Sequence, residues 1–136
     1  MKKEFSKKWK SSKQPRKQRK YLHNLPLHLR QKLFAATLDK VLRKKYNTRN
    51  IELRKGDEVK VMRGEFKGKV GKINKVDRKK IRVSIEGITR SKSDGSKVEV
   101  WFHPSKLRII KLNENDKKRF KQIEKKQKTT EEKKNA

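Results

Sequence analysis

The chain has 136 residues, and its 44 Lys and Arg against 15 Asp and Glu give it a formal net charge of +29 at pH 7. Only 29% of the residues are hydrophobic, too few to bury a core along the whole length, so we expect one modest domain with basic extensions. No cysteine is present, which excludes a disulfide framework and a cysteine zinc site. No apolar run approaches the roughly 20 residues of a membrane span, and no apolar segment follows the basic start, so we expect neither a membrane span nor a secretory signal.

Residues 1–20 are predicted to form a basic N-terminal extension. They contain ten Lys or Arg and one acid, Glu4. Such a segment cannot bury a core, so we expect it to be solvated in the free protein and to become ordered on a partner. Trp9 stands among lysines, where its ring suits stacking on a base or lying along a sugar-phosphate ridge.

Residues 21–50 are predicted to form two short helices that pack on the main domain. Pro26 suits a first helical position, and Thr37 suits the N-cap of a second helix. The two helices would join near Ala35-Ala36, and residues 47–50 would form a connector. An apolar stripe at helical spacing is expected to face the main domain; it consists of Leu38, Val41 and Leu42.

The pattern of residues 51–112 predicts about five short strands. So many short strands in so short a segment indicate a mainly β fold that forms a small and strongly curved barrel. The turn signals are residues 54–57, residues 77–80 and the Asp94-Gly95 pair. In KVGKINKV, residues 69–76, the alternation breaks, so we expect a bulge or sharp bend there. The positions predicted to face inward, with Trp101 opposite, are Val59, Val61, Ile81, Val83, Ile85, Val98, Val100 and Phe102.

The stretch VMRGEFKGKVGKI, residues 61–73, holds three of the six glycines. It lacks the GxxxxGK[ST] and GxGxxG patterns, so it is not a nucleotide phosphate loop. Gly64 and Gly68 are expected to permit a turn, and Gly71 a bend in the next strand. Phe66 is either a core plug or a stacking surface, and the plug is favoured. The cations that surround these glycines are Arg63, Lys67, Lys69 and Lys72.

Residues 113–136 are predicted to form a basic C-terminal helix and tail. Asn115 or Asp116 would cap the helix, and the final TTEEKKNA would lose helical structure. One face of the helix is expected to carry Phe120, Ile123 and Gln127. This stripe is thin, so the helix needs a partner to be stable.

No catalytic or metal-binding constellation is recognisable. The histidines are His23, His28 and His103, none at HxxxH spacing and none joined by a carboxylate cluster. The serines lack a nucleophile context. We therefore expect no enzyme activity, no cofactor and no metal.

The one-sided charge predicts a polyanionic partner. Residues 51–112 alone carry eighteen cations and eight acids, whereas solubility would be served by mixed charge. An anionic membrane surface is the competing partner, but it would require a broad apolar helix face or a lipidation signal, and neither is evident. We expect nucleic-acid binding dominated by phosphate and shape recognition.

The residues of one stretch, RKGDEVKVMRGEFKGKVGKI at 54–73, resemble a KOW motif. Together with HLRQKLF at 28–34, LDKVLRKKYNTRNIELRKGDEV at 38–59 and DGSKVEVWFHPSKLRI at 94–109, they resemble the archaeal and eukaryotic form of universal large-subunit ribosomal protein twenty-four, over residues 15–118. The resemblance implies that the chain folds as an SH3-like β-barrel (KOW domain). It also implies that the protein belongs to cytoplasmic ribosomes, joins the large subunit early in assembly and lies near the mouth of the polypeptide exit tunnel.

The implied partners are large-subunit rRNA (chiefly its 5′ domain), neighbouring large-subunit proteins and nascent-chain factors. Two other functions remain open, a KOW module of a transcription elongation factor and a general DNA-compacting protein. Elongation factors carry a separate α/β domain before their KOW repeats, and no stretch here could form one. Charge and resemblance together give the candidate RNA-binding residues, which are Arg16, Lys17, Arg19, Lys20, Arg30, Lys32, Arg63, Lys67, Gly68, Lys69, Lys72, Arg78, Lys79, Lys80, Arg90, Lys92, His103 and Lys106.

Overall fold

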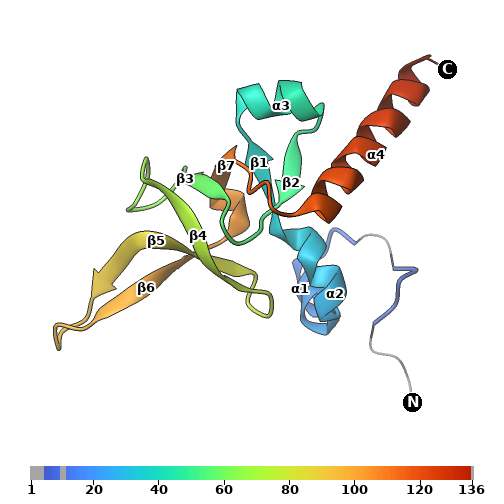
Figure 1. The fold of residues 1–136 in the computed structure, drawn as a ribbon. Coiled ribbons are helices and arrows are strands. Elements are labelled where there is room, and N and C mark those ends of the chain that lie inside the picture. The colour runs from blue at the N-terminus through green and yellow to red at the C-terminus, as the bar shows by residue number, and fades with distance from the viewer. Residues whose placement is uncertain (1–4, 10–11, 136) are drawn as a thin grey trace.

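The computed structural model describes residues 5–9 and 12–135, and its body is a seven-stranded sheet in the order β2-β1-β7-β3-β4-β5-β6 (Figure 1). The strands are β1 (Ala35–Leu38), β2 (Asn50–Glu52), β3 (Glu58–Val61), β4 (Val70–Asp77), β5 (Arg82–Ser91), β6 (Lys97–Phe102) and β7 (Leu107–Lys111). The helices are α1 (Pro15–Asn24), α2 (Leu27–Arg30), α3 (Lys40–Tyr46) and α4 (Lys117–Asn135), with 3-10 turns η1 (Gln31–Phe34) and η2 (Pro104–Lys106). The fold is a small, mainly β domain, as predicted. Within these described ranges, no helix is long and apolar enough to cross a membrane.

The core contains most of the positions that the alternating strands predicted for it. Five of the eight inward positions are buried: Val59, Val61, Val83, Ile85 and Phe102. Ile81 and Val100 are only partly buried, and Ile81 precedes β5 with a φ of 55°. Val98 is 39% exposed because this part of β6 extends beyond the core in the hairpin with β5.

The predicted irregularity in β4 is confirmed. The register between β4 and β5 shifts between Ile73 and Lys75, and Ile73 is buried. At Gly71 the two strands approach closely, because a Cβ there would lie 2.6 Å from Ile85 Cγ2 and 3.0 Å from the Glu86 carbonyl oxygen. Gly71 thus permits the close crossing beside the bend.

The two-helix prediction for residues 21–50 is wrong at its centre. Residues 35–38 form β1, which pairs antiparallel with β2 and parallel with β7. Its alternation buries Ala36 and Leu38. Thr37 therefore lies inside the strand, and Asp39 takes the N-cap position of α3, whose Val41 is 72% exposed. A strand far along the chain supplies the partner, and this overrides local helical spacing.

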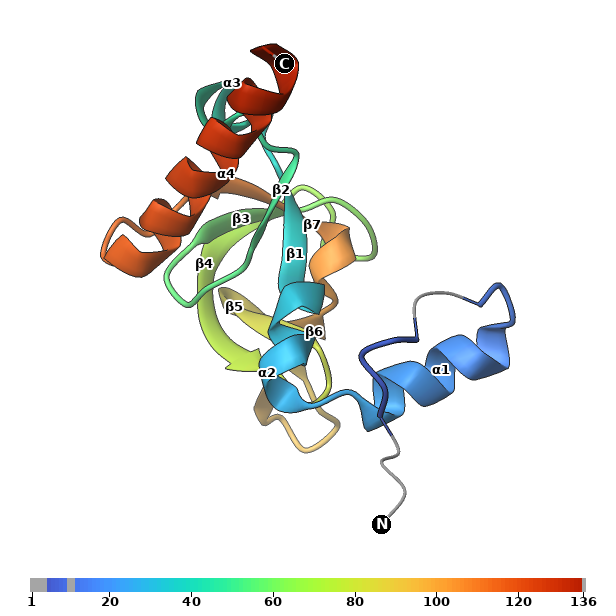
Figure 2. The ribbon, with the colours of Figure 1, turned by 90° about the vertical axis from the view of Figure 1, so that its right-hand side faces the viewer.

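The basic extension also differs from expectation. Part of it lies outside the described residues, namely residues 1–4 and 10–11, but from Pro15 the chain is helical. Proline at the first helical position fits this start. Helix α1 buries none of its residues and lies beside the sheet (Figure 2), so it presents its cations to solvent.

Helix α4 has the partner that its thin stripe requires. Asp116 Oδ1 accepts a hydrogen bond from the Arg119 backbone N–H at 3.1 Å, as predicted for a cap. Ile123 is buried, and the Phe120 ring lies 6.2 Å from that of Tyr46 on α3. The helix continues to Asn135, so the expected loss of helical structure from Thr129 onward is wrong.

A buried ion pair fastens α4 to the sheet domain. Asp57, fully buried, accepts hydrogen bonds from both terminal nitrogens of Arg119, at 2.7 Å and 2.8 Å. Arg119 also donates to the Glu52 carbonyl oxygen at 2.6 Å. The Asp57 carboxylate further accepts from the backbone N–H groups of Arg54 and Asn113. The sequence assigned Asp57 only to a turn, and its pairing with Arg119 was not predicted.

Candidate nucleic-acid interface

The glycine-rich stretch forms a closed loop between β3 and β4. The Gly68 N–H donates to the Val61 carbonyl oxygen at 2.8 Å, and the Val61 N–H donates to the Lys69 carbonyl oxygen at 2.9 Å. Gly64 and Gly68 have φ values of 99° and 89°, which confirms the turn predicted for them. L-residues rarely adopt this left-handed region.

The cations of this loop are exposed to solvent, and the loop beneath them is packed against the core through Phe66. The Phe66 ring is partly buried and meets the Phe102 ring edge-on, with centroids 6.0 Å apart, so the core-plug interpretation is confirmed. Lys69 Nζ lies 5.0 Å from the centroid of the same ring. Arg63 and Lys67 are exposed beside it, and Lys72 is exposed on β4.

A second segment meets this loop. The Met62 N–H donates to the Lys106 carbonyl oxygen at 2.8 Å, which holds η2 against the start of the loop. Lys106 is exposed. We call the cations that this arrangement gathers the loop cluster, which consists of Arg63, Lys67, Lys69 and Lys106.

Gly68→Val is expected to damage the loop cluster. The φ of 89° strains any L side chain, and a β-branched one most, even though no atom lies within 4 Å of the position that a Cβ would occupy. We expect a loss of roughly 1–2 kcal/mol in the free energy of unfolding by urea titration, and weaker RNA binding. Unchanged stability and affinity would remove the backbone role assigned to Gly68.

His103 caps η2 and is not positioned as a free cation. Its Nδ1 accepts from the Ser105 backbone N–H at 3.2 Å and lies 2.8 Å from Ser105 Oγ. Burial, and then the nearby charges of Arg82 and Lys106, lower the pKa of His103 below its ordinary 6.5. In the free protein His103 is therefore mainly neutral at pH 7.

An NMR titration of the free protein is expected to place the His103 pKa below 6.5. Because the folded-state pKa is depressed, the unfolded chain takes up the proton first, so stability falls as pH drops through and below 6.5. Lys106→Ala removes one repulsion and is expected to raise the His103 pKa part of the way back. A pKa at or above the ordinary value would contradict the effect of burial.

A second group of cations surrounds the turn between β4 and β5. Asp77 Oδ1 accepts from the backbone N–H groups of Lys79 and Lys80, at 2.9 Å and 3.1 Å, which fixes the turn. Arg78, Lys79 and Lys80 are exposed. Lys32 is exposed on η1. We call the three exposed side chains of the turn, residues 78–80, the turn cluster.

Arg30 joins the turn cluster to α1 through its own hydrogen bonds. Its guanidinium donates to the carbonyl oxygens of Lys79 at 2.5 Å and of Leu25 at 3.0 Å. It also reaches Leu22 and His23, at 3.1 Å and 2.8 Å, in the last turn of α1. The geometry thus makes Arg30 a positioning residue that holds α1 beside the turn cluster. The exposed cations on α1 are Arg16, Lys17, Arg19 and Lys20.

The hairpin of β5 and β6 projects from the body (Figure 1) and carries the last candidates. The Lys92 N–H donates to the Ser96 carbonyl oxygen at 2.8 Å, and Gly95 has a φ of 86°, so the predicted Asp-Gly turn is confirmed. Lys92 is exposed at the tip. Arg90 forms an ion pair with Glu65, which ties the hairpin to the loop between β3 and β4 and offsets part of its charge.

Two features of the interface were missed from the sequence. The carbonyl contacts of Arg30 and the contacts of Trp9 with Tyr21 both join residues that no local pattern relates. The position of Trp9 among basic residues was the sequence signal for the aromatic contact. No group of acids or histidines that could hold a metal ion exists among the described residues.

Comparison with known proteins gives the family of this chain. The profile of a family that comprises the ribosomal proteins L26 of eukaryotes and L24 of archaea matches residues 12–126, which include all of the candidate residues. Large ribosomal subunit protein uL24 of Sulfolobus acidocaldarius is 52% identical over 121 residues, covering 89% of this chain and 90% of that protein. This chain therefore belongs to the ribosomal protein family of eukaryotic L26 and archaeal L24.

Proposed function

We propose that this protein is a structural constituent of the large ribosomal subunit and binds large-subunit rRNA. The observation that carries the proposal is the family membership, together with a loop cluster whose exposed cations lie on a closed, glycine-permitted turn and on the adjacent η2. Fixed cations of one sign match the phosphate backbone, and each contact releases counterions. The net charge of +29 favours such a partner, because a chain this small repels itself at that charge.

The proposal assigns two contact regions. The loop cluster, with Lys72, would engage one phosphate ridge, and the turn cluster with α1 would engage another. Arg30 supports the second region because it fixes α1 beside residues 78–80. The contacts are expected to follow RNA shape, since phosphate contacts position a protein but carry no base sequence.

The finer assignments follow the resemblance. We infer an SH3-like barrel around β3, β4, β5 and β7, and binding to the 5′ domain of large-subunit rRNA. We also infer early assembly near the exit-tunnel mouth on cytoplasmic ribosomes, beside neighbouring large-subunit proteins and nascent-chain factors. The role is structural, with no reaction assigned to any residue.

The test is fractionation of ribosomes from the native source. The protein is expected in large subunits at one copy each, and it should remain there through a moderate salt wash. Recovery only from the unassembled pool would overturn the proposal. A competition between a 5′-domain rRNA fragment and duplex DNA at fixed salt separates this function from DNA compaction, which predicts no preference for the RNA.

A further inference from the structure

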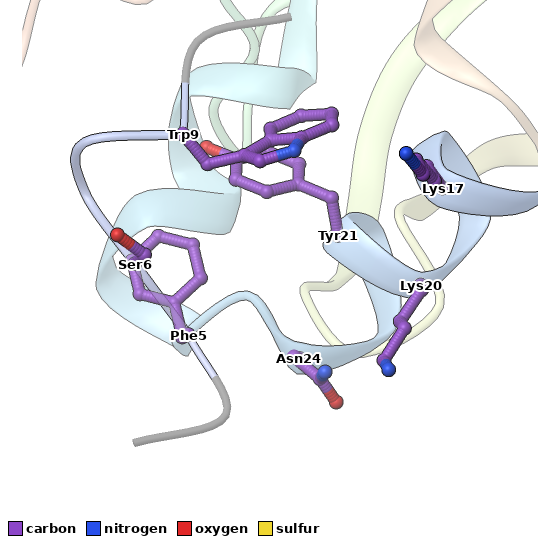
Figure 3. A pocket seen from close by; sticks show the side chains of 7 residues that line it. All are labelled: Phe5, Ser6, Trp9, Lys17, Lys20, Tyr21 and Asn24. Atoms are coloured by element: carbon purple, nitrogen blue, oxygen red, sulfur yellow. The ribbon is translucent and has the colours of Figure 1, made fainter. Parts of the chain in front are cut away.

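Three aromatic rings gather on α1 outside the sheet core. The Trp9 ring stacks on Tyr21, with centroids 4.7 Å apart and an interplanar angle of 25°. The Phe5 ring lies 5.5 Å from Tyr21. All three side chains are only partly buried. Phe5 and Trp9 therefore lie against Tyr21 of α1 with part of their ring surface exposed to solvent (Figure 3).

These rings border a cavity of about 160 Å³ whose other walls are polar. Lys17, Lys20 and Asn24 of α1 line it, and Figure 3 shows Phe5 on the side opposite the two lysines. An apolar cavity of about 150 Å³ accommodates a benzene ring, so this one has room for one planar ring. The site thus combines aromatic faces with two ammonium groups at its edge.

The chemistry of the walls selects the occupant. Lys17 and Lys20 would repel a cationic ligand, and no Asp or Glu is among the described residues that line the cavity. A ligand that carries both an aromatic ring and a phosphate fits both parts of the lining. Its ring can stack on the aromatic side chains, and its phosphate can pair with the lysine ammonium groups. A nucleotide of a single-stranded RNA has this composition.

We propose that the cavity formed by Phe5, Trp9, Tyr21, Lys17 and Lys20 binds one unpaired RNA base together with its adjacent phosphate. The inference rests on the proposed RNA-binding function and adds base stacking to it. The stacked Trp9 and Tyr21 rings are already in place, so little order has to be created on binding. Stacking tolerates any base, so the site would select an unpaired conformation of the RNA over a sequence.

The test compares two oligomers with equal numbers of phosphates. A ten-nucleotide oligoadenylate and an abasic ten-mer are titrated into the full chain carrying Trp101→Phe, which leaves Trp9 as the one tryptophan. Oligoadenylate is expected to quench Trp9 fluorescence, and the abasic oligomer is not. Equal quenching by both, or by neither, would overturn the proposal, because phosphate attraction or ring packing alone would then account for the site.

A second measurement uses the anisotropy of the end-labelled oligomers. Trp9→Ala is expected to weaken oligoadenylate binding roughly 5- to 150-fold, the range for losing one stacked base, and to leave binding of the abasic oligomer unchanged. Trp9→Phe should retain most of the affinity because a ring remains. The matched control is Leu22→Ala, which removes an exposed apolar side chain of α1 outside the cavity and should change neither affinity.

Equal weakening by Trp9→Ala and Leu22→Ala would overturn the proposal, since it would indicate general damage to α1. The result is also separable from the proposed function. Normal assembly into large subunits with no effect of Trp9→Ala on oligoadenylate would remove the base site alone. Absence from large subunits with intact base discrimination would remove the ribosomal function alone.

Discussion

Asp57→Ala or Arg119→Ala is expected to reduce the free energy of unfolding by about 3–5 kcal/mol, a large effect for a single change. Both partners are buried, with side-chain exposures of 0% for Asp57 and 4% for Arg119. Removing Arg119 leaves a buried carboxylate, and removing Asp57 leaves a buried guanidinium. Urea unfolding followed by circular dichroism measures the loss.

The matched control is the exposed pair of Arg90 and Glu65, whose side chains are 64% and 65% exposed. Exposed pairs are screened by water, so Glu65→Ala should cost less than about 1 kcal/mol. A double replacement, Asp57→Leu with Arg119→Met, leaves no unpaired buried charge and should cost less than the sum of the single changes. Additive losses, or a loss as small as that of Glu65→Ala, would contradict the assigned role of burial.

The second large effect is expected on RNA affinity. Replacing Lys67, Lys69 and Lys72 together with Ala should lower the slope of log affinity against log salt concentration by roughly 2–3 units, because three phosphate contacts are lost. The three side chains are exposed, so the fold is expected to keep its stability. Filter binding of a 5′-domain rRNA fragment over a salt series measures the slope.

The control is an equal loss of charge elsewhere. Lys121, Lys125 and Lys128 are exposed on α4, away from both clusters in sequence. Their triple replacement with Ala removes the same three charges and should change the slope much less if the loop between β3 and β4 makes the contacts. An unchanged slope in the Lys67, Lys69 and Lys72 variant would place the RNA contacts elsewhere on the chain.

The sequence by itself determined the features that depend on neighbouring residues. Alternation of apolar and polar residues placed Val59 and Val61 in the core, and the broken alternation marked the irregular β4. Glycines at turn positions identified the loop of Gly64 and Gly68. These features were predictable because strand period and positive φ are local properties of the chain. Net charge likewise indicated a polyanionic partner.

Only the tertiary structure decided the features that join distant residues. β1 became a strand because β2 and β7 pair with it, although its own sequence fits a helix boundary. Arg119 meets Asp57 across 62 residues, and Arg30 meets the Lys79 carbonyl across 49, so two of many similar arginines became structural. The sequence shows how many basic residues the chain carries, but it does not distinguish their roles. Burial and hydrogen-bond geometry decide which of them are enclosed by the protein and which remain exposed to solvent.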